Sequence, residues 1–392
     1  MNEVVIVSAL RTPIGSLSGT LSSISAPKFG SIVIKEVLNQ SGLKNREVDQ
    51  VILGNVVTAG TGQAPARQAA IYAGLHDNVD CLTINKVCGS GMKAVMLGVQ
   101  EILTGSANIV IAGGMESMSN APYILPNARK GYKLGNNIIQ DSIITDGLWD
   151  VYNNFHMGNA AEICSRSQNI SREEQDQFAI ESYKRSQHAI TSNYFKNEIV
   201  DVTIEDKNGK IIISQDEEPF KVKFDKINSL KPAFEKNGTV TAANSSKIND
   251  GAAALLLMSH EEAKKRNLKP IAKILGFSSH SRKPEEFTIA PTDSTLKLLK
   301  KLSLTQNDFD LFEINEAFSV VALANMKLLN LSHEKVNVNG GAVSLGHPIG
   351  ASGARILVTL INALQTRKLK RGLASICIGG GEATSLALEL LN

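Results

Sequence analysis

Residues 88–116 read CGSGMKAVMLGVQEILTGSANIVIAGGME, and this stretch decides the fold. A cysteine followed by three small residues opens a segment, 92–103, whose apolar residues have the spacing of a helix. Residues 107–112 are then almost uniformly apolar, as expected for a buried strand, and a glycine pair follows them. A helix that leads into a buried strand is typical of a layered α/β protein.

The upstream sequence continues this alternation. Residues 4–9 form an apolar, partly β-branched run, residues 27–39 have a helical pattern, and residues 51–57 have the character of a strand. The order of elements is therefore that of βαβ units, and the sequence predicts an α/β fold built in layers.

The pattern of the first half recurs in the last third of the chain. The stretch that starts with His347-Pro-Ile-Gly-Ala-Ser-Gly opens a second helix, and the strand LASICI follows it. This strand ends in Gly-Gly-Gly-Glu382, as the earlier strand ends in Gly-Gly-Met-Glu116. VDQVILGN and FDLFEINE also resemble each other and align Asp49 with Asp310. We interpret the two halves as a duplication, with chance similarity between generic βα units as the alternative.

Residues 119–249 differ in character from both halves. They hold the only tryptophan and five of the six tyrosines, and they give fewer clear βα signals. Long irregular segments in compact proteins are usually functional. We predict four segments: an N-terminal core half (1–118), an inserted loop domain (119–249), a return to the N-terminal half (250–270) and a C-terminal core half (271–392).

The composition excludes several classes of protein. The 392 residues are 43% hydrophobic and 20% charged, which is ordinary globular usage. Lys and Arg total 41 against 38 for Asp and Glu, and a net charge of +3 is too small to favour a nucleic-acid binder. The clear apolar run at 251–258 is far shorter than the roughly 20 residues that span a membrane.

The N-terminus and the cysteines suggest a compartment. The sequence MNEVVIVSALR lacks a basic region and is expected to be a buried strand, not a signal peptide. The chain has four scattered cysteines and no CxxC motif, which favours free thiols in a reducing compartment. We therefore expect a cytoplasmic protein.

Cys88 is the first candidate for chemistry. A lone cysteine is most often a small buried hydrophobe. Here the thiol precedes a helix, where unpaired backbone N–H groups and the helix dipole favour a thiolate, and the adjacent glycines let a ligand approach the backbone.

His347 lies in a glycine-rich run that lacks the Walker lysine and is not a clean dinucleotide motif. A general base beside a thiol is the better interpretation.

Two further candidates lie at expected strand ends, where α/β proteins bind ligands. Cys377 ends an apolar strand and precedes three glycines, although a buried strand cysteine would be the ordinary interpretation. Asn315 follows the strand expected before NEAF, where an asparagine would ordinarily be a helix N-cap.

Six blocks together resemble the signatures of the thiolase family, in the family's order and over essentially the whole chain. They are VCGSGMKA, AGGMESMS, TVTAANSSKINDGAAA, NEAF, GGAVSLGHPIGASGAR and CIGGGEA. The resemblance is closest to the acetoacetyl-CoA thiolases. It implies a thiolase fold of two duplicated βαβαβαββ halves in α-β-α-β-α layers with an inserted loop domain. It also implies reversible Claisen condensation of two acetyl-CoA to acetoacetyl-CoA and CoA through an acetyl-cysteine.

The resemblance also implies roles for five residues. Cys88 would be the acylated nucleophile, His347 its activating base, and Cys377 the acid and base at the substrate α-carbon. Asn315 would hold a water that stabilises a thioester oxyanion. The backbone N–H groups of Cys88 and Gly379 would form a second oxyanion hole.

The implied contacts to CoA and to the acyl group are looser. They comprise Ser246, His156, Met157, Leu148, Phe234 and Phe318. A potassium ion is found near the CoA site of some members, and the matching positions are Tyr183, Ala242, Ala243 and Val343. Two departures lie beside them, since Ser245 replaces an alanine and Lys247 stands where small or hydroxyl residues are usual.

The family implies acetyl-CoA, acetoacetyl-CoA and CoA as ligands, with no covalently bound cofactor. It also implies a homotetramer, a dimer of dimers, in which part of the inserted loop domain makes the tetramer contact. Neither a nucleic acid nor a membrane is expected as a partner. The alternatives are a degradative 3-ketoacyl-CoA thiolase of broader chain length, a ketosynthase, and a thiolase-like lipid carrier without catalysis. The FHMG block favours the short-chain enzyme, and the four polar site residues argue against a carrier.

Overall fold

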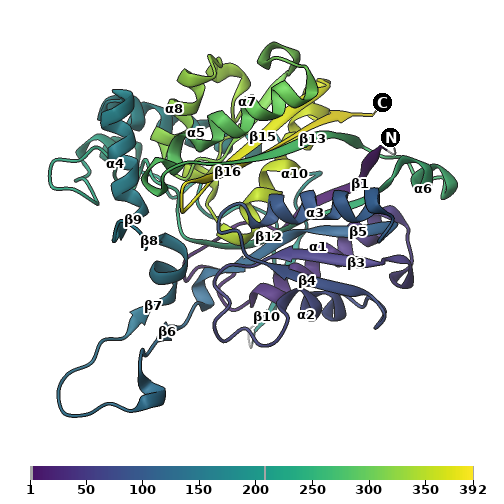
Figure 1. Ribbon diagram of the computed structural model, residues 1–392, viewed down its shortest axis with the longest axis horizontal. Coiled ribbons are helices and arrows are strands. Elements are labelled where there is room, and N and C mark those ends of the chain that lie inside the picture. Colours follow the sequence, from purple (N-terminus) through teal and green to yellow (C-terminus); the bar gives the residue numbers. More distant parts are fainter. Residues whose placement is uncertain (1–2, 207–208, 392) are drawn as a thin grey trace.

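The computed structural model describes residues 3–206 and 209–391 (Figure 1). Its helices are α1 (Ala26–Ser41), α2 (Pro65–Tyr72), α3 (Ser90–Thr104), α4 (Met157–Gln168), α5 (Arg172–Thr191), α6 (His260–Lys265), α7 (Ala290–Leu302), α8 (Ser319–Leu328), α9 (Ala342–Leu345) and α10 (Ile349–Arg367). The long strands are β1 (Val4–Arg11), β3 (Gln50–Gly54), β4 (Asp80–Ile84), β5 (Ile109–Ser117), β10 (Val202–Asp206), β11 (Gly209–Ile213), β12 (Asn249–Ser259), β13 (Ala272–Ser281), β14 (Leu311–Ile314), β15 (Arg371–Ile378) and β16 (Glu382–Leu390). Two-residue strands are β2 (Gly15–Ser16), β6 (Tyr123–Ile124), β7 (Gln140–Asp141), β8 (Trp149–Asp150) and β9 (Phe155–His156).

The main sheet has two halves of the same topology. Its order is β14-β15-β16-β13-β1-β12-β5-β3-β4, with β2 beside β12. In the first half β3 pairs parallel with β5, β5 antiparallel with β12, and β12 antiparallel with β1. In the second half β14, β15, β16 and β13 repeat these pairings in the same order and sense. This repetition is the duplication that the sequence predicts.

Two aspartates at equivalent positions confirm the alignment of Asp49 with Asp310. Asp49 Oδ2 accepts from the backbone N–H groups of residues 108 and 109 at 2.8 and 2.9 Å, at the start of β5. Asp310 Oδ2 accepts in the same way from residues 370 and 371 at 2.9 and 2.8 Å, at the start of β15. Each carboxylate therefore fixes the register between the first two strands of its half.

The strand registers correct the alignment of Glu116 with Glu382. Gln50 pairs with Val110 in the first half, whereas Leu311 pairs with Gly372 in the second. Counting along β5 and β15 from these pairs shows that Glu116 of the first half is equivalent to Ile378 of the second half. Glu382 instead begins β16.

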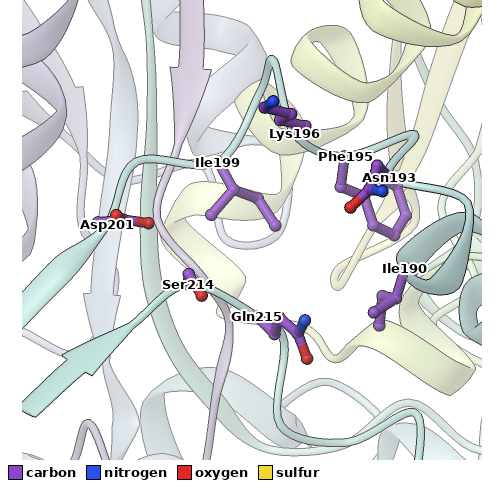
Figure 2. Close-up of a pocket in the computed structure, with 8 residues that line it drawn as sticks. All are labelled: Ile190, Asn193, Phe195, Lys196, Ile199, Asp201, Ser214 and Gln215. Carbon is purple, nitrogen blue, oxygen red and sulfur yellow. The ribbon is translucent and has the colours of Figure 1, made fainter.

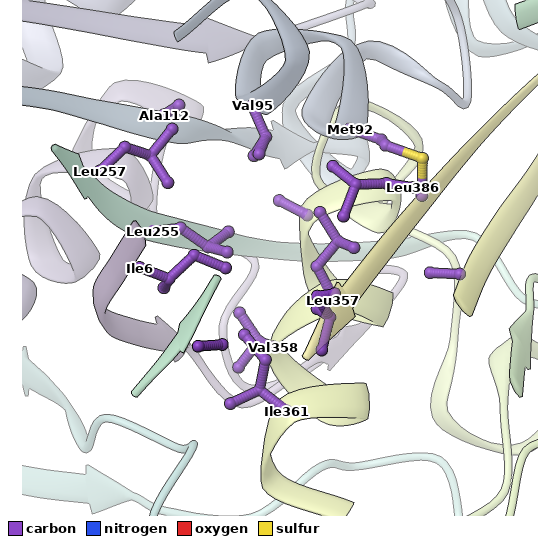
Figure 3. Packing of buried hydrophobic residues seen from close by; sticks show 14 of the residues in the cluster. Ile6, Met92, Val95, Ala112, Leu255, Leu257, Leu357, Val358, Ile361 and Leu386 are labelled. Carbon is purple, nitrogen blue, oxygen red and sulfur yellow. The ribbon is translucent and has the colours of Figure 1, made fainter. Parts of the chain in front are cut away.

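Helices α3 and α10 form the middle layer between the two halves of the sheet (Figure 1). Their apolar side chains pack with those of β5, β12 and β16 in one core, part of which is drawn in Figure 3. Glycines allow the close crossing of the two helices. A Cβ on Gly91 would lie 2.7 Å from the backbone nitrogen of Ala354, and one on Gly353 would lie 2.5 Å from that of Met92. The small residues after Cys88 and His347 are thus required for packing as well as for ligand access.

The outer layers cover the remaining faces of the sheet. Helices α1 and α2 pack on the first half, and α7 packs on the second. The strand expected at residues 51–57 ends earlier, at Gly54, because the N–H groups of Val56 and Val57 turn to the carboxylate of Glu116. The layered α-β-α-β-α arrangement agrees with the prediction.

The inserted segment joins the core through a buried cation. The guanidinium of Arg11, on β1, bonds to Glu198 Oε1 at 2.6 Å and to both carboxylate oxygens of Asp216 at 2.7 and 2.9 Å. Thr359 of α10 also donates to Glu198 at 3.1 Å. After this segment the chain returns as β12 between β1 and β5.

A projecting arm, defined here as residues 123–141, extends from the inserted segment (Figure 1). Short strands β6 and β7 close its base. Its loop exposes several large apolar side chains, which are Tyr123, Leu125, Tyr132, Leu134, Ile138 and Ile139. Exposed apolar groups gathered on one element usually mark a surface that is covered in an assembly.

Candidate active site

The turn between β4 and α3 places Cys88 just before the helix begins at Ser90. Val87 has φ 44°, a left-handed conformation that is strained for a β-branched residue. Ser90 Oγ accepts from the N–H of Lys86 at 2.8 Å and donates to the carbonyl of Val87 at 2.7 Å. These bonds close the turn, so the backbone fixes where the thiol lies.

The thiol of Cys88 is protonated at neutral pH. Burial raises its pKa to about 11, and the N–H groups of Gly379 and Cys88 itself, which donate to the sulfur, offset only part of this rise. The backbone donors act in the expected direction and favour the thiolate, but desolvation outweighs them. The same two N–H groups are the predicted oxyanion hole, and both face the sulfur.

The hydrogen bonds around His347 favour one tautomer of its ring. Its backbone N–H donates to Asn249 Oδ1 at 3.0 Å, and its Nδ1 lies 2.6 Å from Ser352 Oγ. That hydroxyl also lies 2.9 Å from the carbonyl oxygen of Pro348. A carbonyl only accepts, so a Ser352 hydroxyl that donates to Pro348 favours Nδ1 of His347 as the donor to Ser352. In that tautomer Nε2 is unprotonated, and Nε2 is buried without a partner among the described residues.

The imidazole of His347 is neutral. Burial lowers its pKa to about 3, and the positive charge of Arg355, farther along α10, acts in the same direction. A neutral imidazole with a free Nε2 can accept a proton from a thiol. The Cys88 thiol and the His347 imidazole are therefore both neutral at neutral pH.

Cys377 and Gly379 lie at the end of β15. Cys377 is fully buried, and burial raises its pKa well above the usual range, with the charge of Cys88 as the next cause. The two sulfurs are thus close enough to interact. A Cβ placed on Gly379 would lie 3.3 Å from the sulfur of Met157, so the acyl-side residue Met157 also lies at this strand end.

Asn315 follows β14 and is almost completely buried. Helix α8 begins at Ser319 with Phe318 as its N-cap, so Asn315 is not the capping residue. Neither atom of its side-chain amide has a partner among the described residues. A buried polar group left unpaired costs about 1–3 kcal/mol, which favours a water or substrate oxygen as its partner. The water-holding role stays a prediction.

A cavity of about 610 Å³ leads to His347. It is lined by seven of the predicted residues, namely Leu148, His156, Phe234, Ala242, Ser246, Phe318 and His347. Cys88, Cys377, Asn315 and Met157 do not line it, but Cys88 packs against the apolar cluster that contains Met118 and Ile349, which do. The cavity therefore ends beside the reactive thiol.

Three aromatic rings form one wall of this cavity. The His156 ring stacks on Phe234 with centroids 4.8 Å apart, and Phe234 meets Phe318 edge-on at 6.1 Å. Nδ1 of His156 accepts from the N–H of Gly158 at 3.0 Å and so caps α4. Burial lowers the pKa of His156, so the wall carries no charge at neutral pH. Met157 lies behind it, in the apolar cluster that contains Phe318 and Cys377.

Comparison with known proteins identifies the family. The model of the family described as "Thiolase, N-terminal domain" matches residues 4–261, and that of "Thiolase, C-terminal domain" matches residues 268–390. The chain belongs to the thiolase family. The boundary between the two matches lies between β12, which returns to the first half of the sheet, and β13, which belongs to the second half.

Three relatives of this thiolase are named for the same activity. The chain is 51% identical to a probable acetyl-CoA acetyltransferase of Dictyostelium discoideum, covering 100% of this chain and 95% of the relative. It is 50% identical to a mitochondrial acetyl-CoA acetyltransferase of Bos taurus, with 100% and 92% covered. It is 49% identical to a cytosolic one of Gibberella zeae, with 99% and 98% covered.

Solved structures agree with the fold. The acetyl-CoA acetyltransferase of Bacillus anthracis has a TM-score of 0.98 at 42% identity, with 100% of this chain and 99% of the other covered. A thiolase of Ascaris suum in complex with coenzyme A has a TM-score of 0.95 at 44% identity, with 99% and 100% covered. The thiolase fold is therefore established for this chain.

Two supporting residues of this thiolase were missed in the sequence. Ser352 sets the tautomer of His347, and Asn249 holds its backbone. Ser352 lies in the first turn of the helix that begins just after His347, in the motif GHPIGAS, and that placement could have indicated it. Asn249 lies far away in the sequence, and no local pattern indicates its contact.

The predicted potassium position does not fit a free ion. The carbonyl oxygen of Ala242, one of its expected ligands, accepts from the Nζ of Lys247 at 2.6 Å. Tyr183 and Val343 do pack together, so the matching residues gather at one place. The positive charge already there opposes a metal ion.

A second cavity, of about 290 Å³, lies between α5 and the β10–β11 hairpin (Figure 2). None of the predicted site residues lines it. No group of three or more His, Cys, Asp and Glu side chains within residues 3–206 and 209–391 is arranged to hold a metal. No helix in the described part of the chain is long and apolar enough to cross a membrane.

Proposed function

We propose that this thiolase is an acetyl-CoA C-acetyltransferase, which condenses two acetyl-CoA to acetoacetyl-CoA and CoA and also catalyses the reverse reaction. The observation that carries this proposal is the site itself. A neutral Cys88 thiol faces two backbone donors, a second thiol lies beside it, and a neutral His347 with an unprotonated Nε2 closes the cavity. The names of the relatives support the same activity.

The first half-reaction transfers the acetyl group to Cys88. The thiol gives its proton to His347 Nε2, and the sulfur attacks the thioester carbonyl of acetyl-CoA. The N–H groups of Cys88 and Gly379 stabilise the negative charge on the carbonyl oxygen as it forms. The bond to CoA sulfur breaks, and Cys377 gives its proton to the leaving thiolate.

The second half-reaction forms the carbon–carbon bond. The Cys377 thiolate takes the α-proton of a second acetyl-CoA, while the water held by Asn315 and the protonated His347 stabilise the enolate oxygen. The carbanion attacks acetyl-Cys88, and the Cys88 thiolate leaves and recovers its proton from His347. All protons return to their starting places, so the two half-reactions balance.

Coenzyme A thioesters are the only small molecules that these steps need, so we include no covalently bound cofactor in the proposal. The pantetheine arm would lie in the 610 Å³ cavity, between Ser246 and the aromatic wall. The apolar character of that wall suits a long, uncharged arm, whereas the phosphates would stay at the surface.

The test is to trap the acetyl-enzyme. Mass spectrometry after brief incubation with acetyl-CoA is expected to find acetyl on the Cys88 peptide, and acetoacetyl-CoA plus CoA should yield acetyl-CoA. Cys164→Ala is the matched control, because Cys164 is buried and takes no part in the proposed steps. Acetyl found only on Cys81, Cys164 or Cys377 would overturn the assignment of the nucleophile.

For the assembly we propose a homotetramer, a dimer of dimers. The projecting arm supports this proposal, because Leu134 is completely exposed and Ile138 and Ile139 are 77% and 61% exposed. Light scattering should give four chains, and replacing these three residues with serine should give a smaller particle that keeps its helical circular dichroism. A monomer at micromolar concentration would contradict it.

The compartment is a separate proposal. We place the protein in the cytoplasm, and four free cysteines suit its reducing conditions. The relatives include proteins named as cytosolic and as mitochondrial. Fractionation of cells that express the tagged protein tests the placement, and recovery with mitochondria would contradict it.

A further inference from the structure

The ammonium of Lys247 lies in a pocket of oxygen atoms beside the cavity. Its Nζ donates to the carbonyls of Ala242 at 2.6 Å and Ser245 at 2.9 Å. It also lies 5.8 Å from the centroid of the Tyr183 ring, within the range of a cation–π contact. The lysine thus closes the loop formed by residues 242–247 upon itself and against α5.

The surroundings of Lys247 suit one positive charge. Glu218 is the charged group whose field favours the ammonium, and it lines the same cavity, as does Lys221. Burial acts in the opposite direction and lowers the pKa of Lys247 to about 8. Tyr183 is neutral, since burial raises its pKa above the usual range. A metal ion placed at the same carbonyl oxygens would be repelled by the ammonium of Lys247.

The loop that Lys247 closes carries part of the substrate site. The N–H of Ser246 donates to the carbonyl of Ala317 at 3.0 Å, and the carbonyl of Asn244 accepts from Ser319 at 2.8 Å. These bonds tie the loop to the segment that holds Asn315. Ser246 and Lys247 both line the cavity, so a shift of the loop would move a cavity wall and the predicted pantetheine contact together.

We propose that the Lys247 ammonium is a built-in cation that positions the loop of residues 242–247, so that the enzyme needs no free monovalent metal ion. This proposal rests on the acyltransferase function proposed above. Lys247 acts through the loop and is a positioning residue, not a catalytic one. Below its pKa of about 8 a tethered ammonium occupies its site at any salt concentration, whereas a free ion holds the loop only at concentrations near or above its dissociation constant.

The experiment measures turnover of acetoacetyl-CoA and CoA in sodium and in potassium buffers of equal ionic strength. The unmodified enzyme is expected to differ by less than about twofold between them. Lys247→Ala should raise KM for acetoacetyl-CoA at least about tenfold in sodium, with a smaller change in kcat. Added potassium or methylammonium should lower that KM again, because either can enter the vacated pocket.

Two further variants make the result specific. Lys247→Arg keeps a cation and should retain a KM closer to that of the unmodified enzyme. Lys221→Ala removes another lysine of the cavity, which bonds to Ser16 Oγ at 2.5 Å and not to the loop. Whatever its own effect on KM, potassium should not reverse it, and circular dichroism should confirm that each variant is folded.

Two outcomes would overturn the proposal. One is several-fold activation of the unmodified enzyme by potassium, which would mean that a free ion binds despite Lys247. The other is a folded Lys247→Ala enzyme whose KM is unchanged, or is raised and restored by neither ion. Failure of the unmodified enzyme to turn over acetoacetyl-CoA in either buffer would instead contradict the proposed function.

Discussion

Cys88 and Cys377 come from opposite halves of a duplicated fold, yet their surroundings differ. Cys88 lies on a turn before a helix and is half-buried, with backbone donors at its sulfur. Cys377 lies within a strand and is completely buried. The two copies of the duplicated unit therefore place their cysteines differently. The first copy places Cys88 at the start of a helix, and the second places Cys377 at the end of a strand.

This difference suits two tasks. A nucleophile must be reached by the substrate carbonyl, and its oxyanion needs donors, as the turn at Cys88 provides. An acid or base at carbon needs only to exchange a proton at one point, and Cys377 can do so from a buried strand. The following predictions test this division of labour, from the largest effect to the smallest.

Cys88→Ala should reduce turnover by at least about 10⁴-fold, because no other group can carry the acetyl. A thiol-release assay measures it. Substrate binding by calorimetry should persist, since the cavity is unchanged. Substantial residual turnover would mean that the two cysteines exchange roles.

Alkylation of Cys88 by iodoacetamide should accelerate about tenfold per pH unit from pH 7 to 10, or about 10³-fold, because only the thiolate reacts. The pKa of about 11 places the thiolate above neutral pH. Mass spectrometry of the Cys88 peptide gives the rate. A plateau below pH 8 would show a preformed thiolate paired with His347.

Cys377→Ala should still accept acetyl on Cys88 in mass spectra. It should lose exchange of the α-protons of acetyl-CoA by about 10²- to 10⁴-fold, the usual contribution of a positioned acid or base. Deuterium uptake from heavy water measures exchange. Condensation at the normal rate would show that another group removes the proton.

Ser352→Ala should lower kcat by about 10- to 100-fold, because Nδ1 of His347 loses its acceptor and the tautomer with a free Nε2 loses its advantage. The pH profile of acetylation should shift with it. Ser344→Ala is the control, since this buried hydroxyl bonds to Gly341 and Ser182 instead. An equal effect of both variants would assign Ser352 a merely structural role.

Met157→Ala should narrow the preference for acetoacetyl-CoA over 3-ketohexanoyl-CoA, which we expect to be at least about tenfold in kcat/KM. The Met157 sulfur lies beside Gly379, and a longer acyl tail would have to displace it. Comparison of kcat/KM for both substrates checks this. Equal use of a ten-carbon substrate by the unmodified enzyme would indicate the degradative class.

The fold could be predicted because its signals are local. The alternation of helix and strand, the glycines at the helix crossing and the pair Asp49 and Asp310 are all visible in short stretches. The inserted segment was harder, and helix α5 was missed although Ser171 and Glu174 form a capping box at its start. The apolar residues of α5 follow the helical period only weakly, so the helix does not stand out from the inserted segment around it.

The sequence predicts which residues form the site but not their protonation states. Motifs indicate Cys88, His347 and Cys377, whereas protonation depends on burial by segments distant in the sequence. The same limit applies to Lys247. The sequence marks it as a departure from the family, but only its contacts show that its ammonium bonds to the carbonyl of Ala242, one of the predicted ion ligands.

The left-handed backbone of Val87 has a consequence for how this protein can evolve. Such a conformation costs of order 1–3 kcal/mol, and glycine would adopt it without that cost. Selection for heat resistance alone would therefore reward Val87→Gly. Selection for turnover would oppose it, because a glycine beside Cys88 would make the turn more mobile. The thiol could then move away from the two backbone N–H groups that donate to it. Stability and turnover therefore place opposing demands on the residue at this position.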